Sequence, residues 1–325
     1  MPLFDLDELA AATAVVRAFV PPTPAYAWPL LRKRLGAEII VKHENHTPTG
    51  SFKARGGMVY VDSLRRDARS TPKGVVTATR GNHGQSVAVA AVRNGLPCII
   101  VVPEGNSVEK NAAMEAFGAE LLIAGSDFDE SRVVAAAVEH ERGYHLIPSF
   151  HSGLVKGVST YAQELFASWS DIDTVYVPIG MGSGICGLIT VRDLLGLETE
   201  IVGVVAENAP AYAMSIDAGR PVGTATASTF ADGMACRDPQ VEPFGIISRG
   251  AARVVTVSDD EIADAVRILY SDTHNLAEGA GAAALAAIIK EHSQQACKRL
   301  GMILSGGNID APVFQKILNG QTPKV

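Results

Sequence analysis

The chain has 325 residues, of which 47% are hydrophobic and 19% charged, a balance typical of a globular protein with a large core. Its formal net charge of −7 argues against nucleic acid as a partner, because the phosphates would repel it. No apolar run is long enough to span a membrane. The segment Met1–Ala18 lacks the apolar core of a signal peptide, and the cysteines form no C-x-x-C pair. We therefore expect a cytoplasmic protein.

Strand-like and helix-like patterns alternate along the chain, which predicts an α/β fold with open, mostly parallel sheets flanked by helices. The predicted strands are residues 39–41, 75–78, 98–102, 120–123, 144–147, 175–177, 201–205, 254–257 and 302–304. We expect a small domain at residues 69–149 and a large domain formed by residues 1–68 and 150–325. Residues 219–250 are rich in Gly, Pro and Ser and are expected to be irregular.

The first motif is T-P-T-G-S-F-K-A-R-G-G at residues 47–57, directly after a predicted strand. Ser51 is predicted to be the N-cap of a helix, with Lys53 in the first turn. A dry site and the positive end of the helix dipole favour a neutral lysine amine, and such an amine attacks an aldehyde. Lys53 is therefore a candidate for imine chemistry, although a lysine considered alone is more often solvated.

Three further turns follow predicted strands. Residues 79–86 (T-R-G-N-H-G-Q-S) offer amides and short polar side chains to an anion such as a substrate carboxylate. Residues 180–187 (G-M-G-S-G-I-C-G) suit a phosphate held by main-chain amides, and residues 305–308 (S-G-G-N) end the last strand. Open α/β sheets bind ligands at such strand ends. Together the four segments predict one site for pyridoxal 5′-phosphate.

In this order the motifs resemble the β-family, or fold type II, of pyridoxal-phosphate enzymes, in the branch of threonine/serine dehydratases and serine racemases. The resemblance implies a two-lobed fold like that of the tryptophan synthase β chain, and a homodimer. It also implies a lyase that converts a β-hydroxy-α-amino acid similar to L-threonine or L-serine into a 2-oxo acid and ammonia. The alternatives are a 3-hydroxyaspartate or phenylserine dehydratase, a β-replacement enzyme of the cysteine synthase type and, least favoured, a cofactor-binding protein without catalysis.

The resemblance also assigns roles to residues. Lys53 is implied to be the catalytic Schiff-base lysine. The residues implied to bind the cofactor are Phe52, Lys53, Asn82, Gly180, Met181, Gly182, Ser183, Gly184 and Ser305, of which Met181 and Ser183 depart from the usual glycine run. The residues implied to bind the substrate are Thr79, Arg80, Asn82 and His83.

Two of these positions bear on the reaction. Ser305 matches the residue beside the pyridine nitrogen, and a neutral hydroxyl there does not hold the ring protonated, which favours elimination. Arg80 stands where serine racemases carry a serine, so racemisation is not expected as the main activity. The Arg80 guanidinium is expected either to pair with a second carboxylate, as in 3-hydroxyaspartate, or to bond nearby backbone carbonyls. We prefer the second alternative, and with it a neutral substrate.

Several relatives hold a divalent cation. Glu207 and the Ala211 carbonyl match that site, but Ala213 replaces a carboxylate ligand. A cation is therefore doubtful, and no metal is assigned.

Overall fold

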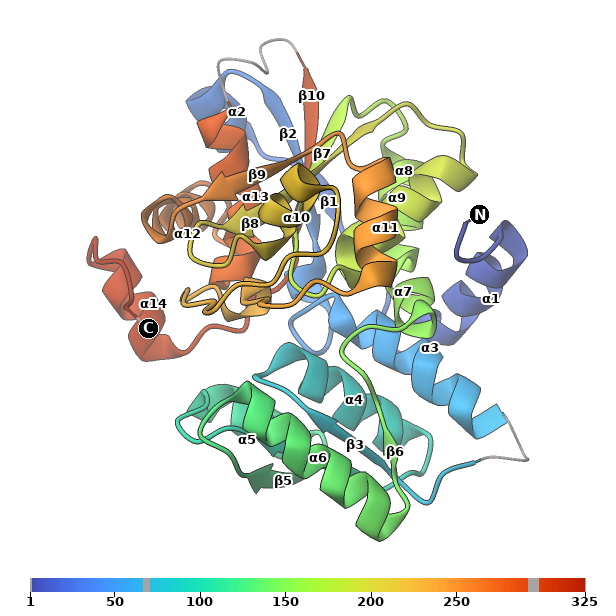
Figure 1. The fold of residues 1–325 in the computed structure, drawn as a ribbon. Helices are drawn as coiled ribbons and strands as arrows, with labels where there is room; N and C mark the ends of the chain where they lie inside the picture. Colours follow the sequence, from blue (N-terminus) through green and yellow to red (C-terminus); the bar gives the residue numbers. More distant parts are fainter. Residues whose placement is uncertain (1, 67–70, 292–297, 325) are drawn as a thin grey trace.

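The computed structural model of the chain describes residues 2–66, 71–291 and 298–324. Its fold is α/β, with two sheets in separate lobes (Figure 1). The fold class predicted from the sequence is confirmed.

Among the described residues, the larger sheet has six strands in the order β1-β2-β10-β7-β8-β9. In that order they span Ala25–Ala27, Glu38–His43, Arg299–Leu304, Thr174–Pro178, Glu200–Ala206 and Arg253–Val257. β1 is antiparallel to β2, and all other neighbours are parallel. β10 pairs with β2 on one side and β7 on the other, so a strand from the end of the chain lies inside the sheet.

The larger sheet is buried on both faces, as is usual for parallel strands. In β2, Ile39 and Val41 pack in one core and Ile40 packs in the other. The first core takes residues from α2, α12, α13 and α14, and the second from α1, α7, α8, α9, α10 and α11. In that order these helices span Pro29–Leu35, Asp259–Thr273, Gly279–Lys290, Ala311–Leu318, Leu6–Arg17, Ser152–Val158, Thr160–Ser168, Ser183–Leu194, Ala211–Ala218 and Val241–Gly250.

The smaller sheet has the strand order β5-β4-β3-β6, and all its neighbours are parallel. In that order its strands span Glu120–Ile123, Cys98–Val102, Val75–Ala78 and His145–Leu146. Residues of α3, α4 and α5 pack on one face, and α6 packs on the other. These four helices span Lys53–Arg66, Asn82–Arg93, Val108–Ala116 and Phe128–Arg142. Two short 3-10 turns, η1 and η2, span Glu44–His46 and Asp232–Met234.

α3 lies between the lobes and packs against α4 on one side and α7 on the other (Figure 1). Both contacts are close enough to require glycine. A Cβ added at Gly57 in α3 would lie 2.2 Å from Ser86 Oγ in α4, and one added at Gly157 in α7 would lie 2.2 Å from the Arg55 carbonyl oxygen in α3. The helix that begins at Lys53 is thus held on two sides.

All nine predicted strands overlap strands of the structure, whereas β1 was not predicted. The expectation that residues 219–250 are irregular is wrong at the end of that range, because Val241–Gly250 forms α11. Pro243 lies in the first turn of that helix, where its missing amide hydrogen costs little, and Ile247 is buried. The two sheets agree with a small domain at residues 69–149, but these boundaries stay a prediction.

The described cysteines, Cys98, Cys186 and Cys236, are free and buried, and Cys297 lies outside the described residues. Within the described ranges, no helix combines the length and apolar character needed to cross a bilayer.

The close contact between α3 and α7 gives a first test. Gly157→Ala should lower the free energy of unfolding by roughly 1–3 kcal/mol, because the new methyl group meets the rigid backbone of Arg55. The measurement is chemical denaturation. Gly245→Ala is the control, since its Cβ would meet only the flexible end of the Arg249 side chain, at 3.3 Å. Equal destabilisation by both variants would contradict the prediction.

Candidate active site

One pocket collects every residue that was predicted to bind the cofactor. It lies at the carboxyl ends of β7 and β10 and is completed by the start of α3 and α4. The residues that line it are Phe52, Lys53, Asn82, Pro178, Gly180, Met181, Gly182, Ser183, Gly184, Gly233, Glu278, Ala280 and Ser305. The four sequence segments therefore form one site, as expected for ligand crevices in open α/β sheets.

The segment before Lys53 is fixed by backbone hydrogen bonds to the segment after β10. Phe52 N donates to the Ser305 carbonyl at 3.0 Å, and Gly307 N donates to the Gly50 carbonyl at 2.9 Å. These bonds place the lysine-bearing helix beside Ser305. Both groups therefore face the same pocket.

The prediction that Ser51 is the N-cap of this helix is wrong. The Ser51 Oγ atom is buried and makes no hydrogen bond. Instead, Thr47 Oγ1 donates to the Ser51 carbonyl at 2.7 Å and accepts from Ser51 N at 2.9 Å. The Thr47 hydroxyl thus fixes the backbone of Ser51 within the turn, and the Ser51 hydroxyl caps no amide of α3.

Lys53 is the first residue of α3 and shares the pocket with Phe52, the glycine loop, Ser305 and one carboxylate, Glu278. Part of its surface faces the pocket, yet the surrounding protein desolvates the amine and lowers the pKa of Lys53 to about 8, against the opposing effect of Glu278. The amine lies 5.2 Å from the centre of the Phe52 ring. An amine with this pKa is neutral in part of the molecules near neutral pH, as a nucleophile or base requires.

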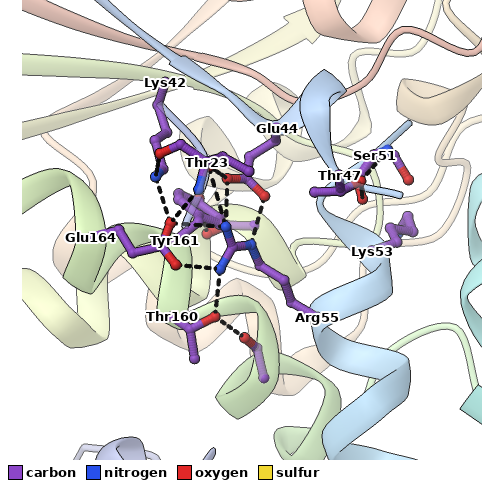
Figure 2. Close-up of polar contacts among 12 residues, drawn as sticks. Thr23, Lys42, Glu44, Thr47, Ser51, Lys53, Arg55, Thr160, Tyr161 and Glu164 are labelled. Carbon is purple, nitrogen blue, oxygen red and sulfur yellow. Dashed lines mark hydrogen bonds and ion pairs between the residues drawn. The ribbon is translucent and has the colours of Figure 1, made fainter. Parts of the chain in front are cut away.

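A buried ion cluster holds α3 in place two residues after the lysine. We call Arg55, Glu44, Glu164 and Lys42 the Arg55 cluster. Arg55 Nε lies 2.7 Å from Glu44, Arg55 Nη1 lies 2.8 Å from Glu164, and Lys42 Nζ lies 2.6 Å from Glu164. Figure 2 shows the cluster on one side of α3, with Lys53 pointing away on the other. Sequence reasoning missed this cluster, because Glu164 is 109 residues away from Arg55 in the chain.

The glycine loop lies between β7 and α9. Gly182 has φ +99°, a left-handed conformation that favours glycine, and no side chain caps the start of α9. Two tyrosines bind the loop from its outer side: Tyr212 donates to the Met181 carbonyl at 3.2 Å and Tyr161 donates to the Gly184 carbonyl at 2.8 Å. The carbonyls are thus bonded away from the pocket, and the uncapped amides of α9 remain for an anion.

Of the residues predicted to bind substrate, only Asn82 lines the pocket. Thr79 Oγ1 accepts from Gly81 N at 3.0 Å and from Gly84 N at 3.3 Å, so it orders the first turn of α4. His83 is buried, and desolvation, together with Lys53, lowers its pKa to about 3. A neutral imidazole is therefore expected there. These substrate contacts stay predictions.

Asn82 is held from two sides. Its Nδ2 donates to Glu278 Oε1 at 2.7 Å, and its Oδ1 accepts from Asn308 Nδ2 at 2.8 Å. Sequence reasoning missed Glu278, which lines the pocket and is buried. Burial raises the pKa of Glu278, and Lys110 opposes that rise. The signal was present in A-E-G-A-G-A-A at residues 277–283, where one acid begins an otherwise apolar helix.

The described residues contain three buried side-chain polar atoms without a hydrogen-bond partner, namely Ser51 Oγ, His83 Nε2 and Glu278 Oε2. All three belong to segments that form the pocket. Buried polar groups in proteins are nearly always bonded, so unpartnered ones indicate a site for a polar ligand. With a desolvated lysine, a glycine loop and the neutral Ser305, these residues fit pyridoxal 5′-phosphate.

The doubtful cation site lies elsewhere. Glu207 is exposed and lines a wide surface hollow, and the Ala211 carbonyl accepts the Ser215 hydroxyl at 2.6 Å inside α10. In the part of the chain that the structure describes, no three His, Cys, Asp or Glu side chains gather to hold a metal ion. Glu207 and Ala211 therefore stay weak candidates.

Comparison with known proteins gives independent evidence on the family of the chain. Residues 16–306 match the family described as pyridoxal-phosphate dependent enzyme. The chain is 31% identical over 318 residues to L-threonine ammonia-lyase of Thermotoga maritima, covering 98% of this chain and 79% of that protein. It is 30% identical over 315 residues to L-threo-3-hydroxyaspartate ammonia-lyase of Saccharomyces cerevisiae, covering 97% of this chain and 96% of that protein. The solved structure of threonine deaminase isoform 2 from Solanum lycopersicum superposes with a TM-score of 0.88 at 29% identity, covering 98% of this chain and 95% of that one.

The Arg55 cluster gives a second test. Arg55→Met leaves Glu44 and Glu164 without their shared cation, so the free energy of unfolding should fall by about 3–5 kcal/mol, measured by chemical denaturation. The control is Arg66→Met on the same helix, which breaks only an exposed pair with Asp62 and should cost about 0.5 kcal/mol or less. A small effect of Arg55→Met would show that the cluster does not anchor α3.

Proposed function

The chain belongs to the pyridoxal-phosphate dependent enzymes, and we propose that it is an ammonia-lyase that eliminates water from a β-hydroxy-α-amino acid similar to L-threonine or L-serine. The observation that carries the proposal is the desolvated Lys53 amine beside the glycine loop and Ser305 in one pocket. The relative from Thermotoga maritima, named for this reaction, supports it. The products would be a 2-oxo acid and ammonia.

The bound cofactor supplies an aldehyde and an electron-withdrawing ring. The uncapped amides at the start of α9 would hold its phosphate, and Phe52 would pack against its ring. Lys53 Nζ would take the α-proton of the substrate, since its lowered pKa leaves part of the amine free to accept a proton near neutral pH. Ser305 would offer one hydroxyl to the ring nitrogen without adding a negative charge there, which favours loss of the β-hydroxyl over other outcomes.

Lys53 is the direct test of this proposal. Lys53→Ala should abolish release of 2-oxo acid and the visible absorbance of the bound cofactor, because the variant lacks the amine that attacks the aldehyde. Lys290→Ala, which changes an exposed lysine at the end of α13, is the control and should leave both signals intact. If the purified Lys53 variant kept turnover and absorbance, another lysine would have to serve, and the assignment would fail.

A dicarboxylic substrate is the second candidate, and Arg80 favours it. Arg80 is exposed, and among the described residues the structure records no hydrogen bond or ion pair for its guanidinium. The bonding to backbone carbonyls that made a neutral substrate preferable is therefore without support. Arg80 lies two residues before Asn82 of the pocket, and the relative from Saccharomyces cerevisiae is named for L-threo-3-hydroxyaspartate. A free guanidinium could bind the second carboxylate of such a substrate in bidentate fashion.

The two substrate classes separate in one experiment. If Arg80 binds a second carboxylate, Arg80→Ser should lower kcat/KM for 3-hydroxyaspartate by a factor corresponding to about 2–5 kcal/mol, and leave serine and threonine nearly unchanged. Arg80→Lys keeps the charge but loses the planar guanidinium, so its kcat/KM for 3-hydroxyaspartate should lie between those of the wild type and Arg80→Ser. Equal loss for all substrates would leave the neutral amino acid as the better assignment.

A homodimer, a cytoplasmic location and the domain boundaries at residues 68 and 150 are also proposals. The resemblance of the motifs supports the dimer and the boundaries, and the free buried cysteines support a reducing compartment.

A further inference from the structure

A second lysine, Lys110, lies buried between the lobes, and the proposed reaction does not use it. It belongs to α5 of the small lobe, and only 7% of its surface is exposed. Its Nζ lies 2.5 Å from Asp232 Oδ2 and 3.8 Å from Glu278 Oε2, both in the large lobe. A buried lysine between two carboxylates stays charged, so Lys110 brings one positive charge beside the pocket.

Both carboxylates are tied to the pocket wall. Glu278 lines the pocket and accepts the hydrogen bond from Asn82. Asp232 precedes Gly233, whose carbonyl oxygen would lie 2.1 Å from a Cβ at Gly180 in the glycine loop. The lysine thus contacts the acid that holds the asparagine and the turn that supports the glycine loop.

The aliphatic part of Lys110 contacts the predicted substrate loop as well. A Cβ at Gly81 would lie 2.4 Å from Lys110 Cδ. Gly81, which lies between Arg80 and Asn82 in the sequence, therefore leaves room for the Lys110 side chain. The Lys110 side chain thus packs against this loop with its aliphatic part and places its charged end near Glu278.

The charge of Glu278 depends on groups from several elements. Burial raises the pKa of Glu278, Lys110 lowers it, Asp232 raises it and Lys53 lowers it, and Lys110 is the strongest of the opposing charges. Burial alone would lower the pKa of Lys110, but Asp232, Glu278 and Asp310 outweigh that effect. Lys110 is therefore the main group that favours an ionised Glu278.

We propose that Lys110 is a positioning residue, which keeps the Glu278 carboxylate charged and in place so that Glu278 holds the Asn82 side chain at the pocket. The inference rests on the proposed function only in taking pyridoxal phosphate as the group that the pocket binds. A charged carboxylate accepts a stronger hydrogen bond than a neutral one. Loss of the charge on Glu278 would loosen Asn82 without removing any side chain that lines the pocket.

The test measures the Kd of the protein for pyridoxal phosphate across a series of pH values, by quenching of the intrinsic fluorescence. In Lys110→Met the pKa of Glu278 rises above its wild-type value of about 7, so binding below pH 7 should weaken by up to about tenfold for each unit of that rise and recover at higher pH. Lys110→Arg keeps the charge and should restore most of the wild-type profile. A merely structural role would weaken binding equally at every pH.

Asp232→Asn tests the same idea in the opposite direction. It removes a like charge near Glu278, so the pKa of Glu278 falls and the binding profile should move to lower pH. This variant carries the test if Lys110→Met does not fold. The matched control is Glu109→Ala, which removes another α5 bond to the large lobe, the 2.8 Å bond from Ala311 N, away from the pocket lining. Its profile should match that of the wild type.

The outcomes are distinct. Profiles that stay unmoved in folded variants, or that move in the same direction for Lys110→Met and Asp232→Asn, overturn the inference while the proposed function stands. A wild-type protein that does not bind pyridoxal phosphate overturns the proposed function and this inference together. Opposite shifts in the two variants, with a wild-type profile for Glu109→Ala, support the role of Lys110.

Discussion

The buried guanidinium of Arg55 is the constraint on which the active site depends. An arginine taken out of water costs several kcal/mol unless its donors are paired, and here they reach Glu44 and Glu164 together. Glu44 follows β2 and Glu164 lies on α8. Their ion pairs with Arg55 therefore hold α3 in place relative to the large sheet. Because Lys53 lies two residues earlier on the same helix, the place of the reactive amine follows from electrostatics outside the pocket. A lysine or methionine in place of Arg55 could not reach both acids in this fork geometry.

The boundary between the lobes holds two lysines whose surroundings give them opposite properties. Lys53 has no carboxylate at ion-pair distance among the described residues, and desolvation lowers its pKa. Lys110 lies against Asp232 and Glu278, which raise its pKa. One amine is thus prepared to lose its proton, and the other to keep it. Glu278 lies close enough to influence both, so the charge state of the pocket is a shared property of the two lobes.

The sequence was sufficient for the fold class, for every strand except β1 and for the grouping of the predicted residues around one pocket, because strand periodicity and glycine-rich turns are local signals. Lys53 and Ser305 could be assigned to one pocket, since parallel strands end at the same edge of a sheet. The N-cap at Ser51 was predicted wrongly, since the Ser51 hydroxyl makes no hydrogen bond and the Thr47 hydroxyl bonds the Ser51 backbone instead. Lys110 and Glu278 were missed for a different reason. Their pairing spans more than half of the chain, so the acid within residues 277–283 does not by itself reveal its partner.

The strand order of the large sheet has a consequence for how the protein is made. β10, which includes residues 299 to 304, is inserted between β2 and β7, which are synthesised long before it. Until β10 emerges from the ribosome, the edges of β2 and β7 that it will cover have no partner, and Phe52 N lacks the carbonyl of Ser305. The nascent chain can therefore form the small lobe early but not the cofactor pocket. Capture of the cofactor in the finished pocket must therefore follow synthesis of β10 and Ser305. Until then, the unpaired edges of β2 and β7 are exposed to chaperones and to aggregation.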